Sequence, residues 1–164
     1  MSKSLAYLTL LVAAATLVVI SVAKPMYLSD ANGFLRNFVN HEFLNVLGVF
    51  LAITLASVAN IHLAFNRIEE RHSKRNALVK SRQNLKKTAY WLISLFCVGG
   101  LVVIVKPVAC TSEISVALFN SAAIIIVLWH VLILISLTEL VFRIEPEFPP
   151  APEGGDDGHN MRGS

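Results

Sequence analysis

Four long apolar stretches constrain the fold of this chain more than any other feature of its sequence. They cover about residues 5–23, 43–65, 89–105 and 115–142. Each approaches or exceeds the roughly 20 apolar residues that an α-helix needs to cross about 30 Å of hydrocarbon. The composition agrees, because 55% of the 164 residues are hydrophobic. We therefore predict an all-α membrane protein whose residues 1–145 form one domain of four transmembrane helices.

The first apolar stretch, residues 5–23, also has features of a secretory signal peptide. Lys3 precedes it, and the small-x-small triplet Ser21-Val22-Ala23 ends it. Its length exceeds that of a usual signal-peptide core, and no soluble domain follows it. We interpret it as a transmembrane span rather than a cleaved leader.

The last part of the chain, residues 146–164, differs in composition from the rest. It contains four prolines and four glycines, together with Glu147, Glu153, Asp156 and Asp157. Such a segment cannot bury enough apolar area to offset the entropy lost on ordering. We predict a disordered acidic tail.

A strongly basic segment, residues 66–88, joins the second and third apolar stretches. It holds eight of the fourteen basic residues of the chain, opposed only by Glu69 and Glu70. The eight are Arg67, Arg71, Lys74, Arg75, Lys80, Arg82, Lys86 and Lys87. Basic residues that flank membrane spans stay on the cytoplasmic side. This orientation places both termini in the cytoplasm, as in a multi-pass protein of the bacterial inner membrane.

The basic segment contains no proline or glycine, so the helix of the second span is expected to continue through it into the cytoplasm. Its positive charge has two explanations. One is topology together with contact with anionic lipid headgroups. The other is binding of a soluble polyanion, such as an oligonucleotide, or of an acidic partner. No aromatic residue is interleaved, so contacts with nucleic acid would be dominated by phosphate and sensitive to salt.

The two halves of the chain resemble each other, which predicts two parallel repeated helical hairpins. Similar sequences occur in the same order: Ala6-Tyr7 and Ala89-Tyr90 open the first and third spans, and Lys24-Pro25 and Lys106-Pro107 are expected to stop them. The second and fourth spans end in related Phe-(Asn)-Arg-Ile-Glu sequences. Because each half runs out and back, these are parallel rather than inverted repeats.

Small and polar residues form a stripe on the second span. At 100° per residue, one face collects Asn45, Gly48, Ala52, Ala56 and Asn60. Small residues spaced by four let helix backbones approach closely in lipid. The stripe is interpreted either as an ordinary helix-packing surface or as a face turned toward a pore or another subunit.

Ionisable groups at membrane depth are costly and are functional candidates by default. His130 is the deepest, and its alternative role is a neutral imidazole bonded to a neighbouring helix. His62 and Glu139 each precede a phenylalanine by three residues, so both are expected near the inner surface. Glu139 is interpreted as part of an ion pair or as part of a gate at the inner mouth.

The sequence gives no support for catalysis. The five histidines lack the spacing of metal ligands, and Cys97 and Cys110 form no C-x-x-C motif. We therefore expect no metal, no cofactor and no enzymatic activity.

The layout resembles small multi-span effectors of bacterial anti-phage defence, and most of all the channel-forming component of Hailong-type systems. The resemblance lies in the four-span plan, in the sequence from Asn60 to Glu69 at the end of the second span, and in the basic extension. It implies a homo-oligomeric ion channel that depolarises the membrane of an infected cell. It also implies a partner nucleotidyltransferase whose oligonucleotide product holds the channel shut.

The hypothesis from the sequence is thus an oligomeric membrane pore gated from the cytoplasm. The alternative is a non-conducting scaffold or accessory subunit that recruits a soluble partner. A small-solute transporter is less well supported, because the spans lack a mid-membrane acid or a broken helix.

The orientation can be tested by cysteine labelling. In intact spheroplasts, a membrane-impermeant maleimide is expected to label the native Cys110 in the loop after the third span, but not a Ser73→Cys variant lacking both native cysteines. Permeabilisation should expose the new thiol. Labelling of position 73 in intact spheroplasts would reverse the orientation.

Overall fold

A computed structural model describes residues 3–72 and 79–143, and this part of the chain folds into helices. The elements are α1 (Lys3–Ala23), the 3-10 helix η1 (Pro25–Tyr27), α2 (Gly33–Phe38), α3 (His41–His72), α4 (Val79–Ala109) and α5 (Glu113–Arg143). Among the described residues, α1, α3, α4 and α5 are long and apolar enough to cross a membrane. The predicted all-α, multi-pass class is thereby confirmed. The predicted acidic tail lies outside the described residues.

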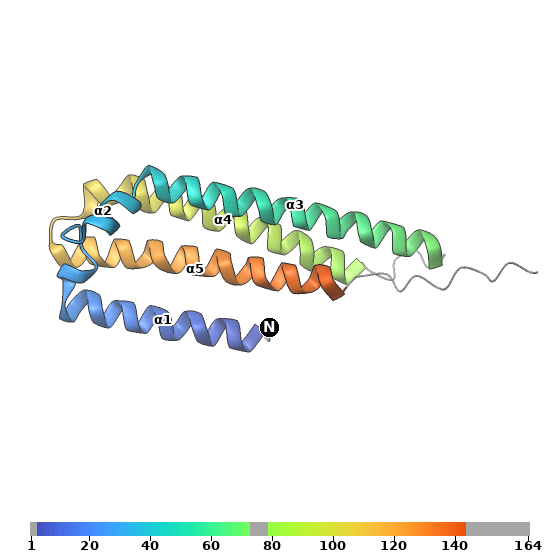
Figure 1. The fold of residues 1–164 in the computed structure, drawn as a ribbon, viewed down its shortest axis with the longest axis horizontal. Helices are drawn as coiled ribbons and strands as arrows, with labels where there is room; N and C mark the ends of the chain where they lie inside the picture. Colours follow the sequence, from blue (N-terminus) through green and yellow to red (C-terminus); the bar gives the residue numbers. More distant parts are fainter. Residues whose placement is uncertain (1–2, 73–78, 144–164) are drawn as a thin grey trace, which may run out of the picture.

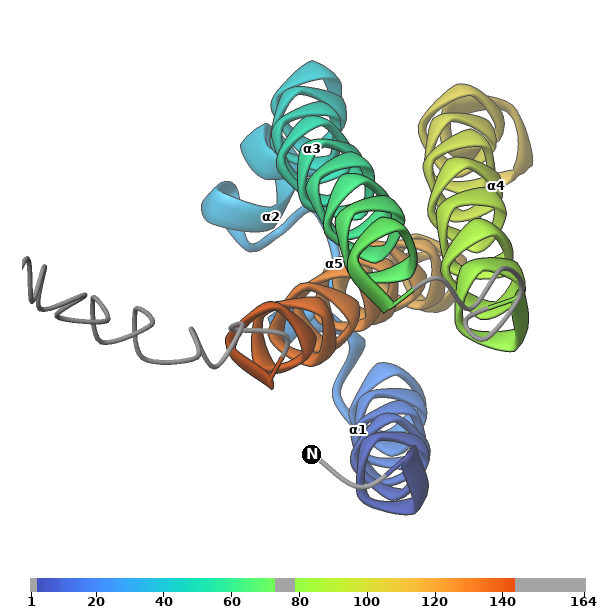
Figure 2. The same ribbon diagram turned by 90° about the vertical axis from the view of Figure 1, so that its right-hand side faces the viewer.

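Helix α5 occupies the centre of the arrangement. It packs against α1, α3 and α4, and also against η1. The end-on view shows α3 and α4 on one side of α5 and α1 on the other (Figure 2). Along their length the four helices run roughly side by side (Figure 1). The bundle is therefore a group of three helices with a fourth, α1, attached through α5.

The packing of α1 bears on the predicted repeat. A duplication would make α1 equivalent to α4, and α3 equivalent to α5. The packing of α3 on α4 then corresponds to that of α5 on α1, and both are extensive. The packing of α4 on α5 has no such counterpart, because α1 lies against α5 and not against α3. The duplication stays a prediction. The two hairpins differ in packing, because α4 packs against α5 whereas α1 does not pack against α3.

Two apolar clusters fill the space between α3, α4 and α5. The cluster toward the α2 end is built on Val39, Phe43, Leu47, Ala123 and Ile126, with Phe96 packed against it. The cluster toward the opposite end is built on Ile61, Phe65, Leu85, Leu92 and Leu137. Each buried side chain of this kind contributes roughly 1.5–3 kcal/mol in water, but in lipid close packing replaces the hydrophobic drive. The stability of the contacts of α3 with α4 and α5 therefore depends on how closely their side chains pack.

The third span ends later than predicted. Lys106-Pro107 was expected to stop it, but α4 continues through Pro107 to Ala109. The proline lies in the last turn, where one lost backbone hydrogen bond disrupts little of the helix. Cys110 N–H still donates to the Lys106 carbonyl at 3.1 Å, so the final turn is closed. In contrast, α1 ends at Ala23 as expected before Lys24-Pro25.

The basic segment, predicted as one continuous helix, is divided between two helices. Helix α3 carries it as far as His72, and α4 begins at Val79. These helix ends belong to α3 and α4, which pack against each other. The described part of the segment is thus the shared end of a helix pair (Figure 1).

A short helix, α2, lies between the first and second spans. Asn32 caps it, because its side-chain oxygen accepts from Phe34 N–H at 3.1 Å. Leu35 and Val39 are buried, whereas Phe34 is exposed. The apolar face of this helix therefore covers the end of the bundle, and its position at the outer membrane surface stays a prediction.

Close packing at Gly99 fixes the distance between α4 and α3. A β-carbon built at Gly99 would lie 2.5 Å from Leu47 Cδ1 and 3.2 Å from Phe43 Cε1. Leu47 and Phe43 are both fully buried, so neither has free space to move into. At the adjacent Gly100 nothing lies within 4 Å. Of the two adjacent glycines, only Gly99 is therefore closely packed against α3.

The pair supplies a matched test of this packing. Gly99→Ala is expected to destabilise the bundle by about 1–3 kcal/mol relative to Gly100→Ala, because it overpacks the α3–α4 contact. Gly100→Ala should be neutral or stabilising by up to about 1 kcal/mol, since alanine is the better helix former. Thermal unfolding of both variants in detergent micelles measures the difference. Equal melting temperatures would contradict the close approach.

Candidate functional site

The predicted stripe on α3 lies mainly on the outside of the protomer. Asn45, Ala52, Ala56 and Asn60 are exposed, and Gly48 is half-buried, with its β-position 3.9 Å from Phe96. The opposite face of the same helix holds the buried residues Phe43, Leu47, Thr54, Ile61 and Phe65. The packing of α3 within its own chain therefore leaves most of the stripe uncovered.

Thr54, on the buried face of α3, shows how a polar group is accommodated there. Its hydroxyl lies 2.6 Å from the Phe50 carbonyl and 3.0 Å from the Leu51 carbonyl, both on its own helix. Thr54 therefore points away from the stripe, and its hydroxyl bonds the backbone of its own helix.

His130 is fully buried in α5, between the two apolar clusters. Its Nδ1 lies 2.9 Å from the Ile126 carbonyl. A carbonyl can only accept, so Nδ1 carries the proton. Nε2 is buried and has no hydrogen-bond partner in the described part of the chain. The expected bond to a neighbouring helix is thus replaced by a bond to the preceding turn of α5 itself.

The two residues expected at the inner mouth lie on different helices. His62 is exposed on α3, and Glu139 is half-buried on α5. Both lie toward the end of the bundle that also carries the basic residues (Figure 1). Their assignment to a gate stays a prediction.

Several basic side chains of the predicted anion-binding segment are accessible. Arg67 on α3 and Lys80, Lys86 and Lys87 on α4 are exposed, whereas Arg82 is half-buried. The Lys86 ammonium lies 5.9 Å from the centre of the Tyr90 ring, within reach of a cation–π contact. Arg71 belongs to the last turns of α3. Lys74 and Arg75 lie outside the described residues.

A polar cluster at the opposite end of the bundle was not anticipated from the sequence. The Lys106 ammonium of α4 donates to Asp30 Oδ1 at 2.7 Å. The Asn120 amide of α5 donates to the same oxygen at 3.2 Å and to the Leu28 carbonyl at 2.8 Å. The loop after α1 is therefore bonded to two transmembrane helices. The sequence signal was the presence of Asp30 and Lys106 in loops that otherwise carry few charges.

The charge state of Asp30 follows from this cluster. Partial burial acts to raise the pKa of its carboxyl group, but hydrogen bonds from Lys106 and Asn120, with the positive charges of Lys106 and Arg36, act more strongly. The pKa is therefore held below its ordinary value of 3.8. Asp30 remains ionised and serves as the counter-charge of a lysine that is 8% exposed.

A second polar contact ties α1 to α5. Ser121 Oγ donates to the Ala117 carbonyl at 2.8 Å, so its lone pairs are available to the Ser21 hydroxyl, also 2.8 Å away. Both serines are buried. Together with the Asp30 cluster, this contact fixes the end of α1 that leads into η1.

Metal ligation has no support in residues 3–72 and 79–143. No group of three or more His, Cys, Asp or Glu side chains comes together there. Cys97 and Cys110 are both free thiols.

Comparisons of the chain with protein-family models, with curated proteins and with solved structures found no match. Its class is therefore defined by its own fold: a multi-pass, all-helical membrane protein.

The Asp30 cluster gives a test of stability against pH. Asp30→Asn is expected to destabilise the folded protein by about 1–3 kcal/mol, because the largely buried Lys106 loses a charged hydrogen-bond acceptor. In the unaltered protein, the contribution of Asp30 is complete above pH 3.8 and is lost as the pH falls through the lower pKa of the folded state.

Unfolding in detergent across an acid pH series measures both effects. Glu42→Gln, at an exposed carboxylate at the start of α3, is the matched control and should change little. A stability of Asp30→Asn equal to that of the control would mean that the cluster contributes nothing.

Proposed function

We propose that the protein is a homo-oligomeric pore of the bacterial inner membrane, with its permeation path between protomers. The observation that carries this proposal is the exposure of the α3 stripe, with polar Asn45 and Asn60 near its two ends. Amide side chains facing lipid are unfavourable, whereas an interface or a water-filled path accommodates them. The small residues Ala52 and Ala56 allow another helix to come close.

The interior of a single protomer supports a path between subunits rather than within one. The clusters between α3, α4 and α5 consist of apolar side chains in contact. A conducting pore requires a continuous path that water can enter. A ring of protomers that places α3 toward its axis would supply an aqueous path lined by the stripe.

Gating by an anionic ligand fits the charge at one end of the helices. Arg67 near the C-terminal end of α3, and Lys80 and Lys87 in the N-terminal part of α4, expose their side chains. The resemblance to Hailong-type defence supplies the ligand class, an oligonucleotide made by a partner nucleotidyltransferase, and the outcome, membrane depolarisation in abortive infection. Contact through phosphate groups alone would suit a surface without interleaved aromatics.

A non-conducting scaffold is the second candidate. The observation that favours it is the same exposed stripe, which could receive a single partner helix instead of other copies of this chain. Such a protein would co-purify with one stoichiometric partner and would leave the membrane tight.

The proposal is tested by ion flux through vesicles that contain the purified protein. The unaltered protein should conduct. Ala56→Trp should reduce flux by about tenfold or more, because a bulky side chain on the stripe either separates subunits or fills the path. Ala15→Trp, at an exposed position on α1, is the matched control and should conduct normally.

The oligomeric state of each variant, measured by light scattering in detergent, separates loss of assembly from a blocked path. Vesicles that stay impermeable at every density of the unaltered protein would rule the pore out.

A further inference from the structure

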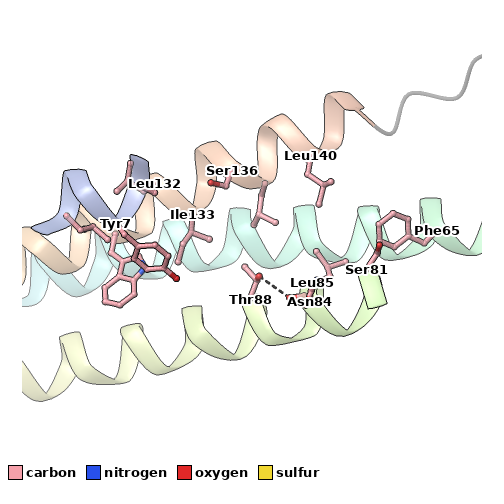
Figure 3. Close-up of a pocket in the computed structure, with 14 residues that line it drawn as sticks. Tyr7, Phe65, Ser81, Asn84, Leu85, Thr88, Leu132, Ile133, Ser136 and Leu140 are labelled. Atoms are coloured by element: carbon pink, nitrogen blue, oxygen red, sulfur yellow. Dashed lines mark hydrogen bonds between the residues drawn. The ribbon is translucent and has the colours of Figure 1, made fainter. Parts of the chain in front are cut away.

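A groove of about 470 Å³ opens along α5, between α1 on one side and α4 and Phe65 of α3 on the other. Figure 3 shows Tyr7 of α1 at one end of it, Leu132, Ser136 and Leu140 of α5 along one wall, and Asn84 and Thr88 of α4 along another. From Trp129 to Leu140, the stretch of α5 that lines it is roughly 16 Å long. The groove is therefore elongated along the helices, and this shape suits an extended acyl chain better than a compact solute.

The groove exists because α1 covers α5 only in part. Helix α1 begins at Lys3 and packs against α5, while α4 and α5 extend beyond its start (Figure 1). Trp91 of α4 stacks on Trp129 of α5 with ring centres 6.2 Å apart. Trp129 also lines the groove, so this aromatic pair bounds it on the side toward the middle of the bundle.

The lining is apolar with a few polar groups. Leucine, isoleucine and aromatic side chains dominate, while Ser81, Asn84, Thr88 and Ser136 add hydroxyl and amide groups. The Thr88 hydroxyl donates to the Asn84 carbonyl at 3.0 Å, so its own helix satisfies it. Within residues 3–72 and 79–143, the side chains of Ser81, Asn84 and Ser136 have no hydrogen-bond partner and can donate to a ligand.

Positive charge stands beside the polar part of the groove. Lys80 and Lys87 each precede a lining residue, Ser81 and Thr88, by one position, and both are exposed. Seven residues apart, they lie on the same face of α4. Lys87 also borders a shallow depression with Tyr90, Trp91 and Ser94. An apolar channel with cations and hydrogen-bond donors along its α4 wall is complementary to an anionic amphiphile.

We propose that this groove is a specific site for an anionic glycerophospholipid. One acyl chain lies between α1 and α5, and the phosphate lies at Lys80 and Lys87. Ser81 and Asn84 donate to ester or phosphate oxygens. Trp and Tyr side chains are typical of the membrane–water interface, so Tyr7 near the start of α1 and Tyr90 beside the lysines of α4 set this end of the bundle at headgroup level. The proposal needs this placement at a membrane surface and does not depend on ion conduction.

The test uses a photoactivatable phosphatidylglycerol, with the reactive group in its acyl chain, added to phosphatidylcholine vesicles that contain the full chain. Irradiation should label peptides that contain Leu10 or Leu132. A phosphatidylcholine probe with the same acyl group should label them about tenfold less, because two lysines favour the anionic headgroup. Excess unlabelled phosphatidylglycerol, but not phosphatidylcholine, should compete.

Two kinds of variant test the site separately. The double variant Lys80→Gln, Lys87→Gln should abolish the preference for the anionic probe. Lys86→Gln should retain the preference, because the Lys86 ammonium lies over the Tyr90 ring. Ala6→Trp fills the groove and should abolish labelling, whereas Ala15→Trp on the exposed side of α1 should not. Because the lysine variants leave the packing unchanged, they keep the test valid if Ala6→Trp fails to fold.

Several results would overturn the proposal. Equal labelling by both probes would indicate ordinary boundary lipid. Equally strong labelling of α3 residues away from the groove would indicate the same. Cross-links from the groove to a second protomer would show that another copy of the chain occupies it.

Discussion

The contact of α5 with every other long helix is the constraint on which the rest of this structure depends. In lipid each helix satisfies its own backbone, so the individual helices form without help from their neighbours. What remains to be specified is which helices touch and at what distance. Helix α5 supplies the common partner, and the fit at Gly99 against Leu47 and Phe43 sets the approach of α4 to α3. Without α5, α1 would lose its main contact with the bundle.

The two ends of the bundle are held in different ways. At the α2 end, Asp30 joins Lys106 and Asn120, and Ser21 meets Ser121, so part-buried and buried hydrogen bonds connect the loop and the helices. At the opposite end, α1 begins short of its neighbours and the groove separates it from α4. Hydrogen bonds are stronger where the protein shields them from water. The α2 end is thus the fixed end of α1, and the other end is held by apolar contact with α5.

The sequence predicted the helices better than their packing. Apolar length identified all four long helices, because crossing a membrane imposes a length that composition reveals. The prediction that Lys106-Pro107 ends the third span was wrong, because a proline in the last turn destabilises a helix little. The pairing of Asp30 with Lys106 joins residues 76 positions apart, and no local pattern encodes such a distance. Helical periodicity defined which residues form the α3 stripe, but their exposure depends on the tertiary arrangement and was not predicted.

The difference between the two ends also bears on how a signal at the basic segment could reach the membrane. The exposed lysines of α4 and Arg67 of α3 lie at the end where the described residues of α1 pack on α5 through apolar contacts. An anion that binds there changes the charge beside the groove, and any shift of α4 relative to α5 changes the width of the groove without breaking a buried hydrogen bond described here. At the α2 end the same shift would have to break the bond of Lys106 to Asp30, which also holds Asn120 of α5. Movement caused by a ligand at the basic end would therefore pivot about the Asp30 cluster. The α3 stripe runs from that pivot toward the basic end, so its Asn60 end would be displaced more than its Asn45 end.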